Sequence, residues 1–143
     1  MLKAGTSIVD ISPKKGIELA GYPHFPRHNT GVNDPLYASC IFLDDGETKI
    51  ALIAMDILFF SRKYVKQVRK RIEKETNIPE GNFFTPLSHT HSGPWAAGRL
   101  DLEALEKGQD VDADYVAQLM EKIVKLVSRA ASHSFKASVG TNS

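Results

Sequence analysis

The chain has 143 residues, a hydrophobic fraction of 42% and a charged fraction of 24%, which are typical of one soluble globular domain with its own core. Its formal net charge of +1 gives no reason to expect a nucleic acid or an acidic membrane as a partner. No apolar run is long enough to span a bilayer, and no signal peptide is visible. We therefore expect a cytoplasmic protein, or a secreted or periplasmic one if a signal peptide has been removed.

The first part of the chain is predicted to be a strand followed by a long loop. Residues 5–11 are rich in β-branched side chains, and Ser12 and Pro13 follow directly and end the strand. Residues 17–34 contain too many Gly, Pro and Asn residues for a helix or a packed strand. Long irregular loops in compact domains are often functional, so we expect this one to lie over a site. Its candidate contacts are Gly21 and Tyr22 for a substrate, and His24 and His28, each of which fits a solvated surface residue equally well.

The middle of the chain predicts a hairpin and then a β-α-β unit. Residues 36–43 and 49–55 flank the turn sequence Asp-Asp-Gly-Glu, which favours an antiparallel pair. The second of these strands is almost entirely apolar, which is typical of a strand covered on both faces. Residues 61–75 have helical spacing, with Ser61 as the N-cap, and 83–88 form the next strand. The connecting helix makes the last two strands parallel.

Polar side chains follow both parallel strands. Asp56 ends the first, and His89 and His91 end the second, directly before the turn Ser92-Gly93-Pro94. Open α/β sheets bind ligands at this edge. Two residues apart on an extended chain, the histidines are expected to point to the same side, where imidazoles can bind zinc or a related metal. A satisfied polar role for each histidine stays open, and Asp56 is a metal ligand, a partner orienting an imidazole, or a helix-capping residue.

The last part of the chain predicts a connection, a long helix and a short strand. Residues 95–112 form the connection, with a short helix near 102–107, and Trp95 either walls the site or covers the core. Residues 113–132 have a wide apolar stripe typical of a core helix, and 135–139 favour a strand. The single cysteine, in an apolar run, is expected in the core. Together the pattern predicts one α/β domain, 1–143, with a mixed, largely buried sheet and helices packed on it.

The order of five short segments resembles the N-terminal part of the neutral/alkaline (non-lysosomal) ceramidase family. These segments are 10–13 (Asp-Ile-Ser-Pro), 20–22 (Ala-Gly-Tyr), 31–37 (Gly-Val-Asn-Asp-Pro-Leu-Tyr), 43–48 (Leu-Asp-Asp-Gly-Glu-Thr) and 89–94 (His-Thr-His-Ser-Gly-Pro). Members of this family are zinc amidases that cleave the N-acyl amide of ceramide. The resemblance implies that His89 is a zinc ligand and that His91 points into the substrate site as a catalytic group. The remaining zinc ligands of the family lie downstream of the segments matched here, so the resemblance implies the N-terminal fragment of a longer catalytic domain.

Two functions follow from these observations. The first is a zinc-dependent amidohydrolase acting on ceramide or a related lipid-like amide, of which this chain carries part of the active site. The second is a truncated or standalone α/β domain without catalytic activity that serves as a binding or structural module. The sequence leaves enzymatic activity of the chain alone uncertain, and it also leaves open a homo-oligomer in which another chain completes the site.

Overall fold

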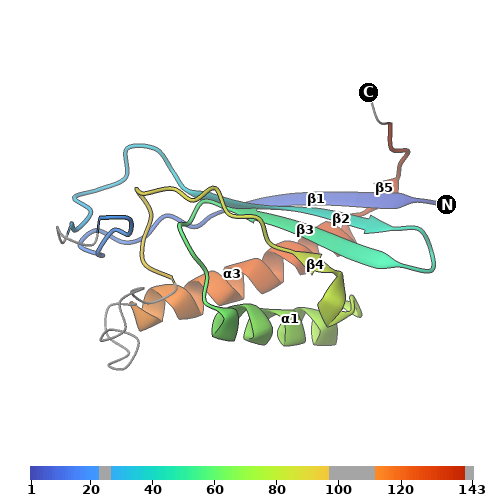
Figure 1. The fold of residues 1–143 in the computed structure, drawn as a ribbon. Helices are drawn as coiled ribbons and strands as arrows, with labels where there is room; N and C mark the ends of the chain where they lie inside the picture. The colour runs from blue at the N-terminus through green and yellow to red at the C-terminus, as the bar shows by residue number, and fades with distance from the viewer. Residues whose placement is uncertain (23–26, 97–111, 141–143) are drawn as a thin grey trace.

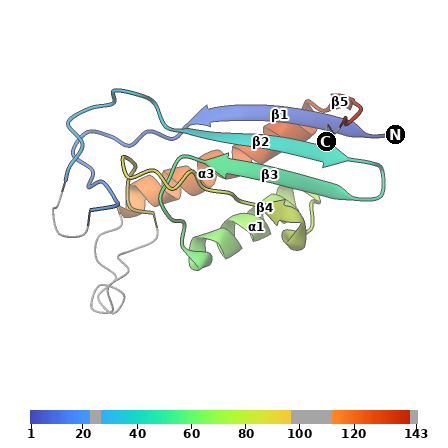
Figure 2. The same cartoon turned by 45° about the horizontal axis from the view of Figure 1, so that its top comes forward.

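A computed structural model describes residues 1–22, 27–96 and 112–140 of the chain. Five strands form one mixed sheet in the order β4-β3-β2-β1-β5, and two long helices lie on one of its faces (Figures 1 and 2). The predicted α/β class is confirmed. The elements are β1 (Lys3–Asp10), β2 (Tyr37–Asp44), β3 (Lys49–Met55), α1 (Arg62–Thr76), the short helix η1 (Glu80–Asn82), β4 (Phe83–Phe84), α3 (Ala113–Ser132) and β5 (Phe135–Lys136).

The antiparallel hairpin of β2 and β3 forms where the turn sequence predicts it. Asp45 Oδ1 accepts hydrogen bonds from the backbone N–H groups of Glu47 and Thr48, at 2.9 and 2.7 Å. Gly46 has a backbone φ of +101°, which residues with a side chain rarely adopt. Local turn chemistry therefore sets the register of these two strands, which pair along their whole length.

The β-α-β unit is also present, and β3 pairs with β4 in parallel. Helix α1 begins at the predicted cap, because Ser61 Oγ accepts a hydrogen bond from the N–H of Lys63 at 3.2 Å. It ends at Asn77, which adopts the left-handed conformation with φ of +56°. Val68 and Ile72 are buried, and Tyr64 and Val65, which the helical spacing places on the same face, are half-buried.

Helix α3 packs so closely on β1 that the strand requires a glycine. A Cβ atom on Gly5 would lie 1.9 Å from the backbone oxygen of Ala130 in this helix. Ser7, two residues along, donates from Oγ to the carbonyl of Leu126 at 2.7 Å. Tyr115 Oη donates to the carbonyl of Ile11 at 2.8 Å. Odd-numbered positions of β1 therefore face the helix, and the core lies between the sheet and the two helices.

Three predictions about strands need correction. Only one face of β3 is covered, since Ile53 is buried whereas Leu52 and Ala54 are exposed on the other face. The strand expected at 83–88 pairs as a ladder only over Phe83–Phe84, with one further bridge between Met55 and Leu87, because Pro86 has no N–H to donate. The strand expected at 135–139 is limited to β5.

Three further predictions concern the cysteine, a short helix and membrane-spanning segments. Cys40 is buried in the core, as expected. The short helix predicted near 102–107 lies outside the described residues. Among the described helices, none is long and apolar enough to cross a membrane.

Candidate functional site

The two histidines lie on a turn that continues the line of β4 along the end of β3. Ser88 N–H donates to the carbonyl of Met55 at 3.0 Å, and His89 N–H donates to that of Ile57 at 3.2 Å. These bonds hold residues 88 and 89 beside the carboxyl end of β3. Open α/β sheets bind ligands at this edge. Here His89 adopts φ of +59°, a left-handed conformation uncommon for a residue other than glycine. Such conformations are typical of functional sites.

The rings of His89 and His91 lie together, but not for the reason that the sequence suggests. Strand alternation is interrupted by the left-handed backbone at His89, so the two residues are not successive outward positions of one strand. The turn nevertheless brings their ring centroids to 5.4 Å, with the planes 67° apart. Both side chains are exposed. Phe59, which follows β3, packs edge-on against His89 with a centroid distance of 5.0 Å and limits where that ring can lie.

The loop that follows β1 contacts this pair, as predicted for a loop lying over a site. Leu19 forms an isolated bridge with Pro94, and Ala20 N–H donates to the carbonyl of Gly93 at 2.8 Å. Gly21 then lies against His91, because a Cβ atom there would be 2.5 Å from Cγ and Nδ1 of the imidazole. Tyr22 places its ring edge-on to His91 at 5.6 Å. The structure therefore brings Gly21 and Tyr22 to the histidines.

Arg27 ties this loop to the histidine turn, a function that sequence reasoning missed. Its Nη2 donates to the carbonyl oxygens of Ala20, at 3.3 Å, and of His91. Its guanidinium lies 4.2 Å from the centroid of the Tyr22 ring, within range of a cation–π interaction. The guanidinium of Arg27 thus holds the loop and the histidine turn together. Among many surface arginines and lysines, no sequence pattern distinguishes Arg27, since its partners are backbone carbonyls far along the chain.

Asp56 follows β3 at the predicted edge of the sheet, but its carboxylate bonds to β2, which lies on the other side of β3 from β4. Its Oδ2 accepts a hydrogen bond from the N–H of Tyr37, at the start of β2, at 3.0 Å. Asp56 therefore does not cap a helix, since Ser61 is the N-cap of α1, and its carboxylate instead connects the end of β3 to the start of β2. His28 is exposed and forms a bridge with Glu18 in the loop, whereas His24 lies outside the described residues.

Trp95 is buried behind the site, and its indole N–H has no hydrogen-bond partner within residues 1–22, 27–96 and 112–140. It packs with Ala20, Leu58 and Phe59 in a small cluster separate from the main core. Because Phe59 contacts His89, this cluster supports the histidine turn from below. Trp95 therefore covers a small apolar cluster rather than the main core, and this cluster reaches His89 through Phe59.

The donor set at the turn suits a metal ion but is incomplete. Zinc binds imidazole nitrogen at about 2.0–2.1 Å and takes three protein ligands in a catalytic site. Rings 5.4 Å apart are close enough for one ion to contact both. Within residues 1–22, 27–96 and 112–140, however, no group of three or more His, Cys, Asp or Glu side chains is close enough to hold a metal. The described residues thus supply two donors.

Two cavities lie near these elements, and one borders the turn. Thr90 and Ser92 line a cleft of about 460 Å³ together with Asn29, Asp34 and Leu36 of the long loop. Thr90 and Ser92 therefore connect the histidine turn to this cleft, where Thr90 Oγ1 accepts a hydrogen bond from the N–H of Ser92 at 3.2 Å.

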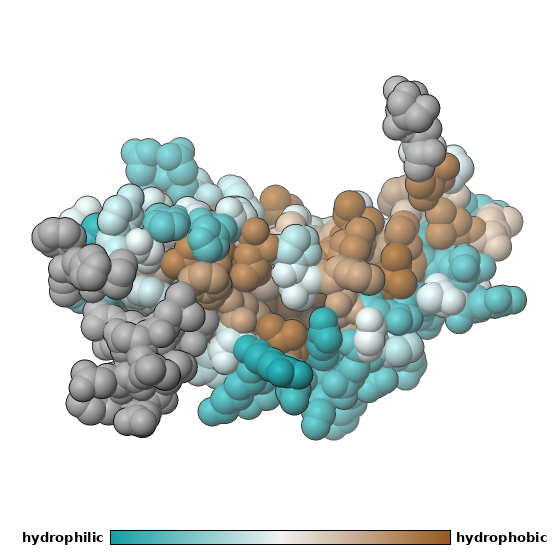
Figure 3. Space-filling view, viewed as in Figure 1, coloured by the Kyte–Doolittle hydropathy of each residue, from teal (hydrophilic) through white to brown (hydrophobic). Residues whose placement is uncertain are grey.

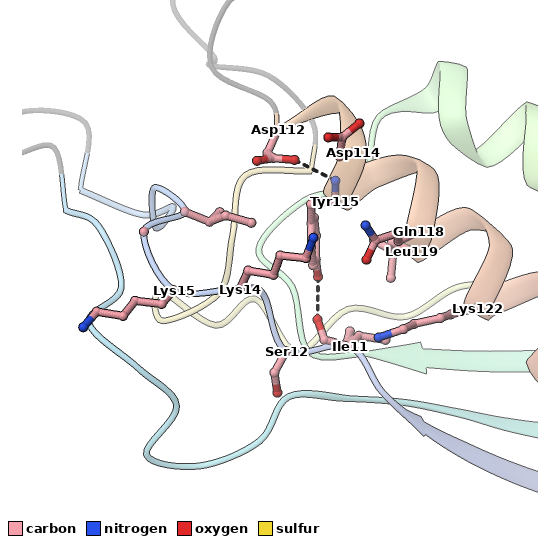
Figure 4. Close-up of a pocket in the computed structure, with 12 residues that line it drawn as sticks. Ile11, Ser12, Lys14, Lys15, Asp112, Asp114, Tyr115, Gln118, Leu119 and Lys122 are labelled. Atoms are coloured by element: carbon pink, nitrogen blue, oxygen red, sulfur yellow. Dashed lines mark hydrogen bonds between the residues drawn. The ribbon is translucent and has the colours of Figure 1, made fainter.

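The second cavity, of about 340 Å³, lies between the end of β1 and the start of α3 (Figure 4). Two of its charged groups are already engaged in the fold. Asp112 accepts the N–H of Tyr115, and Lys122 Nζ donates to the carbonyl of Asp10, both at 2.7 Å. Neither site histidine lines this cavity.

Comparisons with solved structures identify the fold of the chain. A crystal structure of neutral ceramidase from Pseudomonas aeruginosa matches 93% of the chain with a TM-score of 0.75 at 15% sequence identity. The fold is that of part of a neutral ceramidase. A ceramidase complexed with C2 matches the same share with a TM-score of 0.73 at 16% identity. The chain spans about a fifth of both, 22% and 21% of their lengths. No protein-family model and no curated protein sequence matches it.

Proposed function

We propose that this chain contributes part of the active site of a zinc-dependent amidohydrolase that cleaves the N-acyl amide of ceramide or of a related lipid-like molecule. The observation that carries the proposal is the pair of imidazole rings, 5.4 Å apart, on a turn at the carboxyl edge of a sheet with the fold of part of neutral ceramidase. Imidazole is a ligand that zinc prefers, and this edge is where α/β sheets bind ligands.

The two histidines have different roles in the proposal. His89, whose ring is fixed by Phe59 and by a strained backbone, holds the metal. His91, packed between Gly21 and Tyr22, hydrogen-bonds the oxygen of the scissile carbonyl or passes a proton to the leaving amine. When bound, zinc polarises the amide carbonyl and lowers the pKa of a water ligand to about 7. The other ligands come from outside the described residues.

The substrate region is proposed to lie on the loop side of His91. The exposed ring of Tyr22 and the backbone at Gly21 form its wall, and Arg27 holds both in place. An aromatic wall with few charges suits a ligand with an apolar chain and one amide group. A lipid-like N-acyl amide has that chemistry.

A second candidate function is a binding or structural module without catalysis. It is favoured by the incomplete donor set among the described residues and by the chain's span of about a fifth of the ceramidases. The two functions differ in whether the turn retains a metal and whether an amide is hydrolysed.

The test is the zinc content of chelator-washed and zinc-resupplied protein, measured by elemental analysis and followed by an assay of amine release from N-acyl amides. We expect about one zinc per chain in the wild type, loss of zinc in His89→Ala, and retention in His28→Ala as a matched exposed control. Amine release that is lost in His91→Ala would extend the assignment to catalysis by this chain alone. Wild-type protein that retains no zinc would contradict the metal role and leave the module as the better account.

A further inference from the structure

The face of the sheet opposite the helices is uncovered and uncharged. In the described structure, no helix or strand lies over the outward side of β1, β2 and β3 (Figure 2). Ile8, Ile41 and Phe84 are 62%, 47% and 56% exposed. Figure 3 shows the apolar surface of the sheet above the hydrophilic outer side of the helices. The outward positions of the five strands include no charged residue between the strand ends: Ala4, Thr6, Ile8, Ser39, Ile41, Leu43, Ile50, Leu52, Ala54, Phe84 and Phe135.

Strand register concentrates the large side chains in one row. Ile41 of β2 lies opposite Leu52 of β3, which in turn lies opposite Phe84 of β4. Three adjacent apolar side chains thus run from the central strand β2 to the edge strand β4. An antiparallel sheet with one solvated face normally alternates apolar and polar residues, so this composition is typical of a face that packs against another layer. Contiguous exposed apolar patches of this kind mark interaction surfaces.

The size of the face is sufficient for a weak specific interface. The five strands have 8, 8, 7, 2 and 2 residues. At about 3.4 Å per residue and about 4.8 Å between strands, the face measures about 440 Å². Pairing two such faces would bury about 900 Å² in total, the size of a weak, transient interface.

We propose that two copies of this chain pair through this face, sheet against sheet, around a two-fold axis. A two-fold axis places the same patch of each copy against its equivalent, so a charge at the centre would meet a like charge. The absence of charged outward residues on the strands removes that repulsion, and the row of Ile41, Leu52 and Phe84 gives each copy an apolar ridge to interdigitate with. The small area predicts a reversible dimer whose population depends on protein concentration.

The primary test is sedimentation velocity of the chain over a series of concentrations from low to high micromolar. We expect the mass to rise from 15.8 kDa for the monomer toward twice that value. The double variant Ile41→Lys/Leu52→Lys should stay monomeric at every concentration, because its new charges face each other across the axis. Gln67→Lys/Gln118→Lys adds the same charge on exposed positions of the helices and should dimerise like the wild type. Circular dichroism of each variant confirms that it is folded.

A cross-linking experiment locates the interface independently of added charge. Cys40, the one native cysteine, is buried. Ser39→Cys places a thiol on the outward face of β2, and Gln67→Cys places one on helix α1. Under mild oxidation we expect a covalent dimer with Ser39→Cys and only background with Gln67→Cys. A wild type that is monomeric throughout, even if another protein binds this face, would overturn the proposal, and so would a dimer that survives in the lysine double variant.

Discussion

Gly21 shows how one residue determines where a site side chain can lie. Its φ is +100°, and an added Cβ would lie 2.5 Å from the ring of His91. The close approach places the backbone of the loop directly on the imidazole. Any side chain at this position would displace the ring of His91.

We predict that Gly21→Ala destabilises the protein more than Gly46→Ala does. Gly46 has the same strained φ, +101°, but no atom within 4 Å of an added Cβ, so it isolates the backbone cost. The difference, about 1–3 kcal/mol in the free energy of unfolding, reports the steric overlap with His91. Denaturant unfolding of both variants measures it. In the background of His91→Gly, which also removes the Cβ atom of residue 91 at 2.7 Å, the difference should largely vanish, and an equal cost for both glycines would refute the contact.

At the residue scale, sequence reasoning found the groups with distinctive chemistry and missed those that position them. His89, His91, Gly21 and Tyr22 stand in recognisable local patterns. Arg27 and Phe59 act through contacts with residues tens of positions away, and such contacts leave no local pattern. The proximity of the two histidines was expected from strand alternation, whereas the structure achieves it with a left-handed residue at His89.

At the scale of elements, β3 separates the two faces of the sheet. Ile53 points toward the helices and is 1% exposed, whereas its neighbour Leu52 points outward and is 36% exposed. The same strand therefore contributes to the core with one side and to the uncovered face with the other.

We predict that Ile53→Ala lowers the free energy of unfolding by about 2–5 kcal/mol, because it leaves a cavity in the core. Leu52→Ala should cost less than about 1 kcal/mol when measured at a protein concentration low enough to keep the chain monomeric. Chemical denaturation of the two variants beside the wild type makes the comparison. Similar costs at both positions would mean that the outward face is covered in the monomer.

Helices were easier to predict than strands. Helix α3 spans Ala113–Ser132, as predicted, and α1 begins at its predicted cap, because periodicity and capping are local signals. The extents of β4 and β5 depend on which partner strand continues beside them, and this is not a local property. The apolar composition of β3 was assigned to burial on both faces, but the outward side is exposed in the described structure.

Two buried ionisable groups make the stability of the whole molecule depend on pH in the alkaline range. Burial raises the pKa of the Cys40 thiol from 9.0 to about 12. Burial and, to a smaller extent, the charge of Asp10 raise the pKa of the Tyr115 hydroxyl. The unfolded chain therefore loses these protons at lower pH than the folded chain does.

We predict that the contribution of these groups to the free energy of unfolding does not change with pH below pH 9. The free energy of unfolding then falls as the pH rises from 9 toward 12. Each group contributes at most about 1.4 kcal/mol per pH unit. Urea unfolding at a series of pH values measures the slope, and Cys40→Ala should make it shallower. A slope that is unchanged in that variant would contradict the assignment to the thiol.

The central claim is that His89 and His91 form one half of a metal site, and residue-resolved NMR of the histidine rings during titration with zinc tests it most directly. The account predicts that the signals of His89 and His91 shift together and saturate, while those of the exposed His28 and His133 shift much less. In His89→Ala the shift of His91 should be lost, whereas His28→Ala should leave both unchanged. Equal shifts of all five histidines, or none, would contradict the claim.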